Sequence, residues 1–182
     1  MTTHTRAARA APLALATLLA ALTLAPAARA HATLEADEAP ADSTYKAVVR
    51  VGHGCDGEAT LRLRVRIPEG VISVKPMPKA GWELETVSGP YERAFDYFGS
   101  EVTEGVQEIV WAGELADAHY DEFVFRARLT DVLPVGETVY FPVVQECASA
   151  AERWIEIPAE GQSADDLAYP APGVRILPAA PS

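Results

Sequence analysis

The sequence predicts an all-β protein, an antiparallel β-sandwich of the cupredoxin or immunoglobulin type. Several short segments alternate apolar and polar residues with a period of two, which is typical of strands with one buried face. Turn-forming residues separate these segments at regular intervals, as in sandwiches and barrels. No amphipathic segment of ten or more residues after position 30 indicates a helix. Residues 31–182 are therefore expected to form one sandwich domain.

The expected strands can be followed along the chain. The alternation is clearest in 61–67, where Leu61, Leu63, Val65 and Ile67 face one way and three arginines face the other. In the last strand, Trp154 and Glu156 should share one face, with two isoleucines on the other. Glycine or proline marks each expected turn, and the Pro/Ala-rich segment 171–182 contains no predicted strand. The predicted strands are 45–51, 61–67, 71–74, 82–87, 107–111, 123–129, 138–144 and 153–157. The predicted turns are 68–70, 80–81, 88–90, 133–136 and 160–161.

Residues 1–30 have the pattern of a secretory signal peptide. Arg6 and Arg9 precede an apolar run at 12–24, and Ala28-Arg29-Ala30 is a small-residue cleavage site. Cleavage after Ala30 would leave a chain of residues 31–182 that begins with a histidine. No other apolar run approaches the roughly 20 residues that span a bilayer. The sequence predicts a periplasmic or secreted protein without a membrane span.

The charge of the chain limits its partners. The formal net charge is −11, and removing Arg6, Arg9 and Arg29 with the leader would make it −14. Such an acidic surface disfavours nucleic acid and anionic lipid, and it attracts cations without selecting one of them. Solubility outside the cytoplasm would explain the same charge.

The two cysteines, Cys55 and Cys147, are expected to form a disulfide, the usual fate of an even pair in an exported protein. A thiolate pair in a copper or zinc site is the alternative. The long separation and the oxidising compartment favour the disulfide, which would remove both sulfurs from the potential metal ligands.

The predicted cleavage gives His31 a special chemistry. The α-amine and the imidazole Nδ1 of an N-terminal histidine can close a chelate ring on one metal ion, whereas an internal histidine has only an amide nitrogen. His53, flanked by two glycines just after a strand, is a candidate second ligand, because nitrogen donors suit Cu(II). His119 lies on a polar turn and is a weaker candidate. Each histidine could instead be an ordinary surface residue.

Motifs for other chemistry are missing from the sequence. It contains no H-E-x-x-H zinc motif, no G-x-S-x-G nucleophile and no glycine-rich phosphate loop. The chain is not expected to be an enzyme. Trp154 stands out among the tryptophans because its predicted strand places it on the more polar face. Beside a metal, this indole could exclude solvent and limit redox cycling.

A series of short motifs along the chain points to a known family. These motifs are His31-Ala-Thr-Leu-Glu35, 45–51, Val65-Arg-Ile-Pro-Glu-Gly-Val71, Lys75-Pro76, Gly81-Trp82, Phe141-Pro142 and Arg153-Trp154. With them the chain resembles the YcnI-like proteins, the family with the domain DUF1775, over essentially all of residues 31–182.

This resemblance implies an extracytoplasmic sandwich that binds copper through one N-terminal histidine, an acidic ligand and a nearby tryptophan. His31 matches the histidine and Trp154 the tryptophan. Where the family's acidic ligand is expected, this chain has His53, so either His53 or Glu58 would complete the site.

These observations lead to one preferred function and two alternatives. The preferred function is Cu(II) binding in copper homeostasis, as a chaperone, a buffer or a delivery factor for other copper-trafficking proteins. A metal-free extracytoplasmic interaction module is the first alternative. A copper-dependent oxidative enzyme acting on polysaccharides is the second, although the chain lacks a stripe of aromatic residues for sugar binding.

Overall fold

The computed structural model of the chain describes residue 2 and residues 31–181. The predicted signal peptide, 1–30, lies outside the described residues except for residue 2, and so does the predicted cleavage site at its end. Within 31–181 the structure is all-β, as predicted, and the only helical element there is the three-residue 3₁₀ turn η1 (Ala164–Asp166). The predicted fold class is confirmed.

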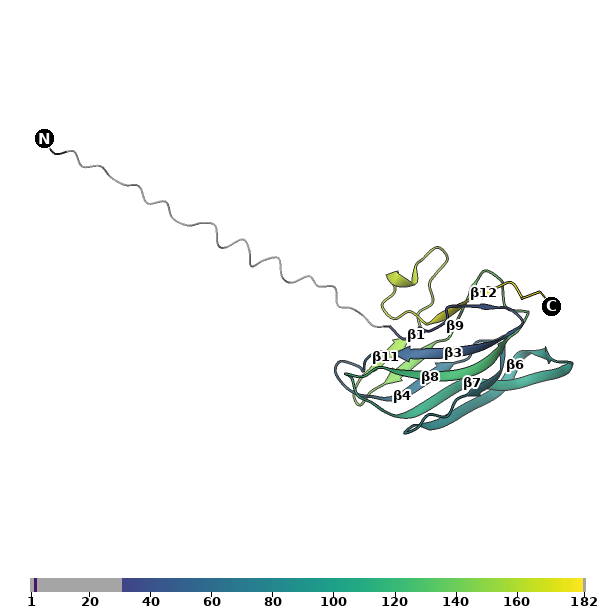
Figure 1. Ribbon diagram of the computed structural model, residues 1–182, viewed down its shortest axis with the longest axis horizontal. Coiled ribbons are helices and arrows are strands. Elements are labelled where there is room, and N and C mark those ends of the chain that lie inside the picture. Colours follow the sequence, from purple (N-terminus) through teal and green to yellow (C-terminus); the bar gives the residue numbers. More distant parts are fainter. Residues whose placement is uncertain (1, 3–30, 182) are drawn as a thin grey trace.

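Twelve strands form three sheets in the described part of the chain (Figure 1). All strand pairs are antiparallel except β2 with β12. The first sheet has the order β1 (Thr33–Leu34), β3 (Ser43–Val51), β8 (Asp121–Leu129), β5 (Val71–Pro76). The second has the order β11 (Ala151–Trp154), β10 (Val143–Glu146), β4 (Thr60–Arg66), β7 (Ser100–Leu115), β6 (Glu83–Tyr97). The third has the order β2 (Glu38–Pro40), β12 (Gly173–Leu177), β9 (Thr138–Tyr140).

The core lies between the first and second sheets. Trp111 of β7 packs edge-on against Phe123 of β8, with ring centroids 5.6 Å apart. In β4, Leu63 and Val65 are fully buried, as their alternation predicted. Leu61 was expected on the same face but is exposed, and it lies where the β4–β7 register shifts between residues 60 and 62. The extra residue is in β7, between Leu115 and Ala112, and such a bulge bends the strand pair and increases its twist locally.

Three further expectations about strands are wrong. The predicted turn at 88–90 lies inside β6, which continues through two register shifts. β6 is an edge strand, so the missing N–H of Pro90 breaks no ladder on its outer side. The predicted strand 138–144 is divided into β9 and β10 at Phe141-Pro142. The segment 171–182, expected to contain no strand, forms β12.

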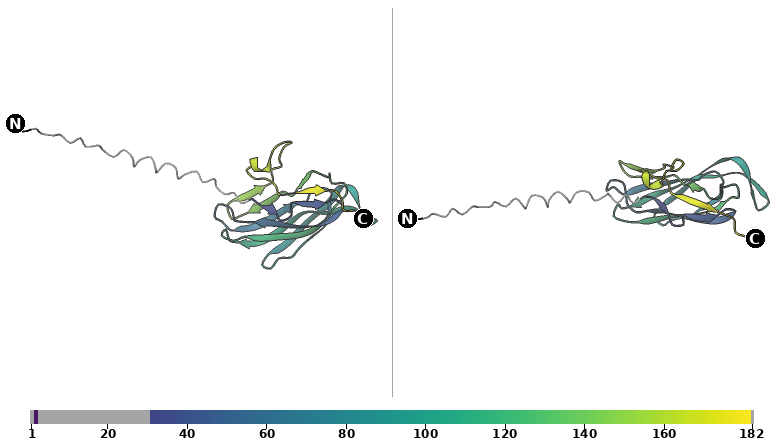
Figure 2. Two further views of the ribbon diagram at one scale, coloured as in Figure 1. Left: turned by 45° about the horizontal axis from the view of Figure 1, so that its top comes forward. Right: turned by 90° about the horizontal axis from the view of Figure 1, so that it is seen from above.

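Two segments project from the sandwich. The β6–β7 hairpin extends beyond the sheets at the end opposite β1 and β11 (Figures 1 and 2). The segment between β11 and β12, which carries η1, stands out on the side where the chain enters β1. The candidate site lies near this second projection, far from the hairpin. None of the helical structure in the described residues has the length and hydropathy needed to span a bilayer.

Candidate metal centre

The pairing of β1 with β3 brings the first candidate histidine to the second. Thr33 lies opposite Arg50 and Leu34 opposite Val49 in this antiparallel pair. Continuing the register toward the start of β1 sets His31 opposite residue 52, next to His53. Two histidines that are 22 positions apart therefore meet at one corner of the first sheet.

Trp154 of the second sheet lies against both imidazoles. Its ring centroid is 5.5 Å from that of His31 and 6.5 Å from that of His53, and both contacts are edge-on. Tyr169, in the segment after β11, packs against the same indole at 5.4 Å. The structure thus brings together the three residues that the sequence singled out, His31, His53 and Trp154, from both sheets of the sandwich.

Trp154 is buried, with 3% of its surface exposed, and it belongs to the main core. The expectation that it lies on the more polar face is wrong. Its strand begins and ends earlier than predicted, at 151 and 154, and the isoleucines at 155 and 157 follow the strand and are exposed. Its indole is therefore both a core side chain and the wall of the candidate site.

One ring nitrogen of His31 is buried without a partner. The residue is half-buried, and its Nε2 is shielded from solvent and makes no hydrogen bond. Buried polar atoms are normally paired. This atom is the ring nitrogen other than the Nδ1 that could chelate a metal together with an α-amine. The residue also borders an open pocket of about 410 Å³, whose wall includes the carboxylates of Asp37 and Asp165.

The loop that carries His53 is tightly constrained. The His53 Nδ1 lies 2.5 Å from the carbonyl oxygen of Gly54. The Gly54 N–H donates to Asp117 Oδ1 at 3.0 Å. A side chain at Gly54 would not fit, because its Cβ would lie 1.7 Å from the Glu58 carbonyl oxygen. This glycine lets the backbone at residue 54 pass close to the backbone of Glu58.

A short hairpin and a disulfide complete the loop. Asp56 and Gly57 both have positive φ, and the backbone groups of Cys55 and Glu58 bond to each other across them. An Asp-Gly pair in this conformation is a common tight hairpin turn. Cys55 is bonded to Cys147, so the predicted disulfide is confirmed and neither sulfur is a thiolate ligand.

Glu58, the alternative acidic ligand, is engaged elsewhere. Its two carboxylate oxygens accept hydrogen bonds from the hydroxyl and the backbone N–H of Ser149, at 2.5 and 2.8 Å. The bond from the hydroxyl is the main reason that the pKa of the Glu58 carboxyl is lowered. This carboxylate therefore stabilises the turn after β10, which leaves His53 as the better candidate to accompany His31.

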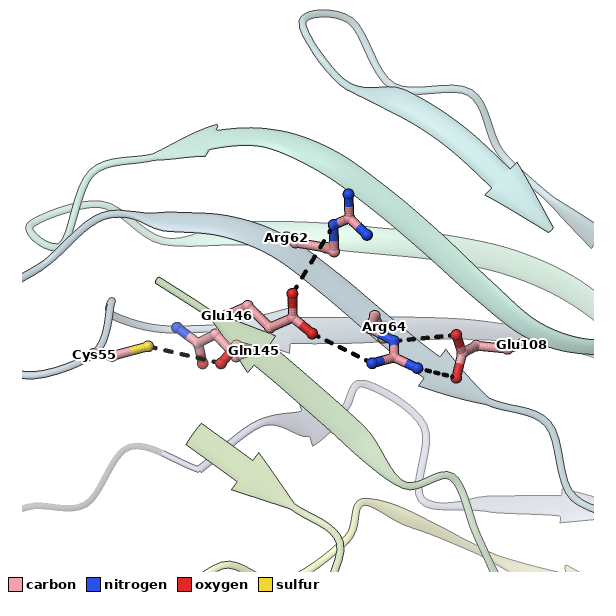
Figure 3. A network of polar contacts seen from close by, with 6 residues as sticks. All are labelled: Cys55, Arg62, Arg64, Glu108, Gln145 and Glu146. Atoms are coloured by element: carbon pink, nitrogen blue, oxygen red, sulfur yellow. Dashed lines mark hydrogen bonds and ion pairs between the residues drawn. The ribbon is translucent and has the colours of Figure 1, made fainter. Parts of the chain in front are cut away.

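Gln145 connects these parts and was not identified from the sequence. Its side chain is buried and bonds to the backbone of His53 and to the indole of Trp154. In Figure 3, Gln145 and Glu146 point to opposite faces of β10. Glu146 faces the surface, where it pairs with Arg62 and Arg64. A glutamine in an alternating strand gives no local sequence signal that it faces inward.

The remaining expectations concern His119 and the number of ligands. His119 is exposed, in a turn closed by its own N–H and the carbonyl of Ala116. Across the described residues, no group of three or more His, Cys, Asp or Glu side chains is arranged to hold a metal ion. At Trp154 the side chains provide two imidazoles, and a third nitrogen would have to come from the backbone.

The comparisons with known proteins give the structural class and the family of this chain. It is an immunoglobulin-like β-sandwich: a crystal structure described as an uncharacterized protein from Nocardia farcinica with an immunoglobulin-like fold matches 81% of this chain and 98% of its own, with a TM-score of 0.56 and 24% identity. The chain belongs to the family described as Domain of unknown function (DUF1775), whose model matches residues 31–176. The predicted family is thereby confirmed. No curated protein shows significant similarity to the chain.

Proposed function

We propose that this protein is an exported Cu(II)-binding protein that acts in copper homeostasis, as a chaperone, a buffer or a delivery factor. The α-amine and imidazole of an N-terminal His31 and the imidazole of His53 are the proposed ligands. One observation carries the proposal: two imidazoles from distant parts of the chain meet at one buried indole. One of them directly follows the predicted cleavage site.

The donor set supports copper over other metals. Nitrogen donors suit Cu(II), whereas Ca²⁺ and Mg²⁺ prefer oxygen and structural zinc sites usually contain thiolates. Both cysteines are joined in the disulfide, and Glu58 is bonded to Ser149.

The predicted cleavage on export supports the proposal, because it would create the third nitrogen donor of the site, the α-amine of His31. In the precursor, the nitrogen of His31 is an amide and cannot chelate. Cleavage after Ala30 would convert it to an amine, so that only the exported form could bind tightly. The family model begins at residue 31, and the disulfide fits an oxidising compartment.

Trp154 would shield the bound ion. Its indole is almost fully buried and is itself covered by Tyr169. An apolar wall on one side limits the approach of water and of a reductant, which favours storage or transfer over oxidative chemistry.

The test compares two forms of the chain that begins at His31, one with a free α-amine and one with that amine acetylated. Both contain every side chain of the site, but only the first has an amine that can chelate together with the imidazole. We expect the first to bind one Cu(II) at least about 100-fold more tightly in a competition titration, because the six-membered chelate is lost in the second. Equal affinities would overturn the proposal.

One observation favours a metal-free interaction module instead. The described side chains do not form a three-ligand group, so without cleavage at Ala30 the site would be incomplete. Metal analysis of the exported protein separates the two functions. A full equivalent of copper supports the first, and its absence after growth with added copper supports the second.

A further inference from the structure

Gln145 makes three hydrogen bonds from a buried position at the candidate site. It is 2% exposed. Its Nε2 donates to the carbonyl oxygen of His53 at 2.6 Å and to Thr60 Oγ1 at 2.7 Å. Its Oε1 accepts from Trp154 Nε1 at 3.3 Å. One amide thus bonds to the backbone of one candidate ligand residue and to the indole beside both imidazoles.

These bonds allow only one orientation of the amide. Both N–H groups of Nε2 are used, and Oε1 receives the single indole N–H. Rotation of the amide by half a turn would set its N–H groups against the Trp154 N–H and its oxygen against the His53 carbonyl. The orientation is therefore determined by the partners, and the amide in turn restrains the indole and the His53 backbone.

The disulfide provides a second connection beside the first. Gln145 lies in β10, and Cys147 directly follows the end of that strand. Gln145 bonds to residue 53, and Cys147 is bonded to Cys55, two positions further along the loop. The loop of residues 53–55 is thus fixed at two points, to β10 and to the residue just after it, with the same spacing on both segments.

A buried amide at this position is costly unless it has a purpose. An apolar side chain of the same size would fill the space without the need to satisfy three polar groups. The neighbouring inward position of β10, Val143, is apolar and fully buried. A polar residue at 145 is therefore explained by what it holds in place.

We infer that Gln145 is a positioning residue of the proposed copper site: it fixes the His53 backbone and the Trp154 indole, so that the His53 imidazole stays at the indole that His31 also contacts. This inference rests on the proposed function for the identity of the metal. Gln145 itself touches no ligand atom of the proposed site. It acts through the backbone of His53 and through Trp154.

Two variants test the inference, with a third as control. Gln145→Met keeps the volume and removes the polar groups. Gln145→Glu keeps the shape but sets an oxygen against the His53 carbonyl. The control is Thr60→Val, which removes a buried partner of Gln145 that has no link to His31, His53 or Trp154. All three should lose stability, so the melting temperature cannot by itself distinguish positioning from structure.

The distinguishing readouts are the Cu(II) EPR spectrum and the affinity. We expect both Gln145 variants to bind Cu(II) about 10- to 100-fold more weakly, with altered g and hyperfine values, and Thr60→Val to keep the parent spectrum. If the Gln145 variants keep the parent spectrum and affinity, or if Thr60→Val changes them equally, the inference is wrong.

A measurement without copper separates this inference from the proposed function. In the metal-free protein, the indole N–H resonance of Trp154 should shift in Gln145→Met and stay in place in Thr60→Val. If the resonance shifts in Gln145→Met but the parent protein binds no Cu(II), the proposed function is overturned. Gln145 would then remain the residue that orients Trp154 and His53. An unchanged resonance would overturn the positioning role itself.

Discussion

The two candidate histidines are attached to the molecule in opposite ways. His31 precedes a strand of only two residues at the edge of the first sheet, and its Nε2 is buried without a partner. His53 lies in a loop that is held by Gln145, by the disulfide and by Asp117. In the proposed site, this difference would divide the roles: the chain end would provide the chelating chemistry, and the loop would provide a rigid position for the second ligand.

Loss of the His31 side chain should have the largest effect. In His31→Ala, the chelate and one imidazole are removed together. We expect the affinity for Cu(II) to fall at least about 1,000-fold in a competition titration. The melting temperature should change by less than about 3 °C, because one residue at a chain end contributes little core area. A variant that unfolds would show that this end also supports the sandwich.

The disulfide should affect stability more than copper binding. Replacing both cysteines with serine removes a link between residues 92 positions apart. Chain entropy predicts a loss of about 4–5 kcal/mol in the free energy of unfolding, measured by urea denaturation. The stoichiometry should remain at one copper. If copper binding disappears while the fold persists, the chain end cannot hold copper without the fixed His53 loop, and the assignment of tight chelation to His31 fails.

His53→Ala should weaken binding without abolishing it. The amine and imidazole of His31 would remain, so we expect the affinity to fall about 10- to 100-fold and the EPR spectrum to show fewer coupled nitrogens. His119→Ala is the matched control, since this exposed histidine makes no ring contact with Trp154 in the described structure. An unchanged spectrum in His53→Ala would exclude His53 as a ligand.

Acidification should weaken copper binding before it affects the fold. The α-amine of a chain that begins at His31, with an ordinary pKa of about 7.7–8.0, must lose a proton to bind. The affinity should therefore fall steadily from pH 8 to pH 5. Flat affinity across this range would argue against the amine.

Glu58→Gln should have the smallest effect. The pKa of the Glu58 carboxyl is lowered in the folded protein, so its ionised form stabilises the fold above its ordinary pKa of about 4.3, and this stabilisation is lost as the pH falls further. The melting temperature of the variant should lie no more than about 3 °C below that of the parent at pH 7. This difference should become smaller at pH 3–4, where the parent also loses the ionised carboxylate. Copper binding should be unchanged in this variant, because Glu58 is bonded to Ser149 and is not a proposed ligand. Weaker copper binding would instead assign the carboxylate to the site.

The sequence predicted the parts of this molecule that repeat a local pattern. The alternation in β4 identified the buried Leu63 and Val65, and residue types and position identified His31, His53 and the disulfide. The bulge that exposes Leu61 and the edge position that tolerates Pro90 depend on strand neighbours, which local patterns do not contain. Gln145 was missed for the same reason, because its role depends on three partners from other strands and loops.

The most direct test of the central claim is the intact mass of the exported protein together with its copper content. The account predicts a chain that begins at His31 with an unmodified amine and binds one Cu(II). A chain that begins at another residue, or that has a blocked amine, and still binds Cu(II) with the same affinity would contradict it.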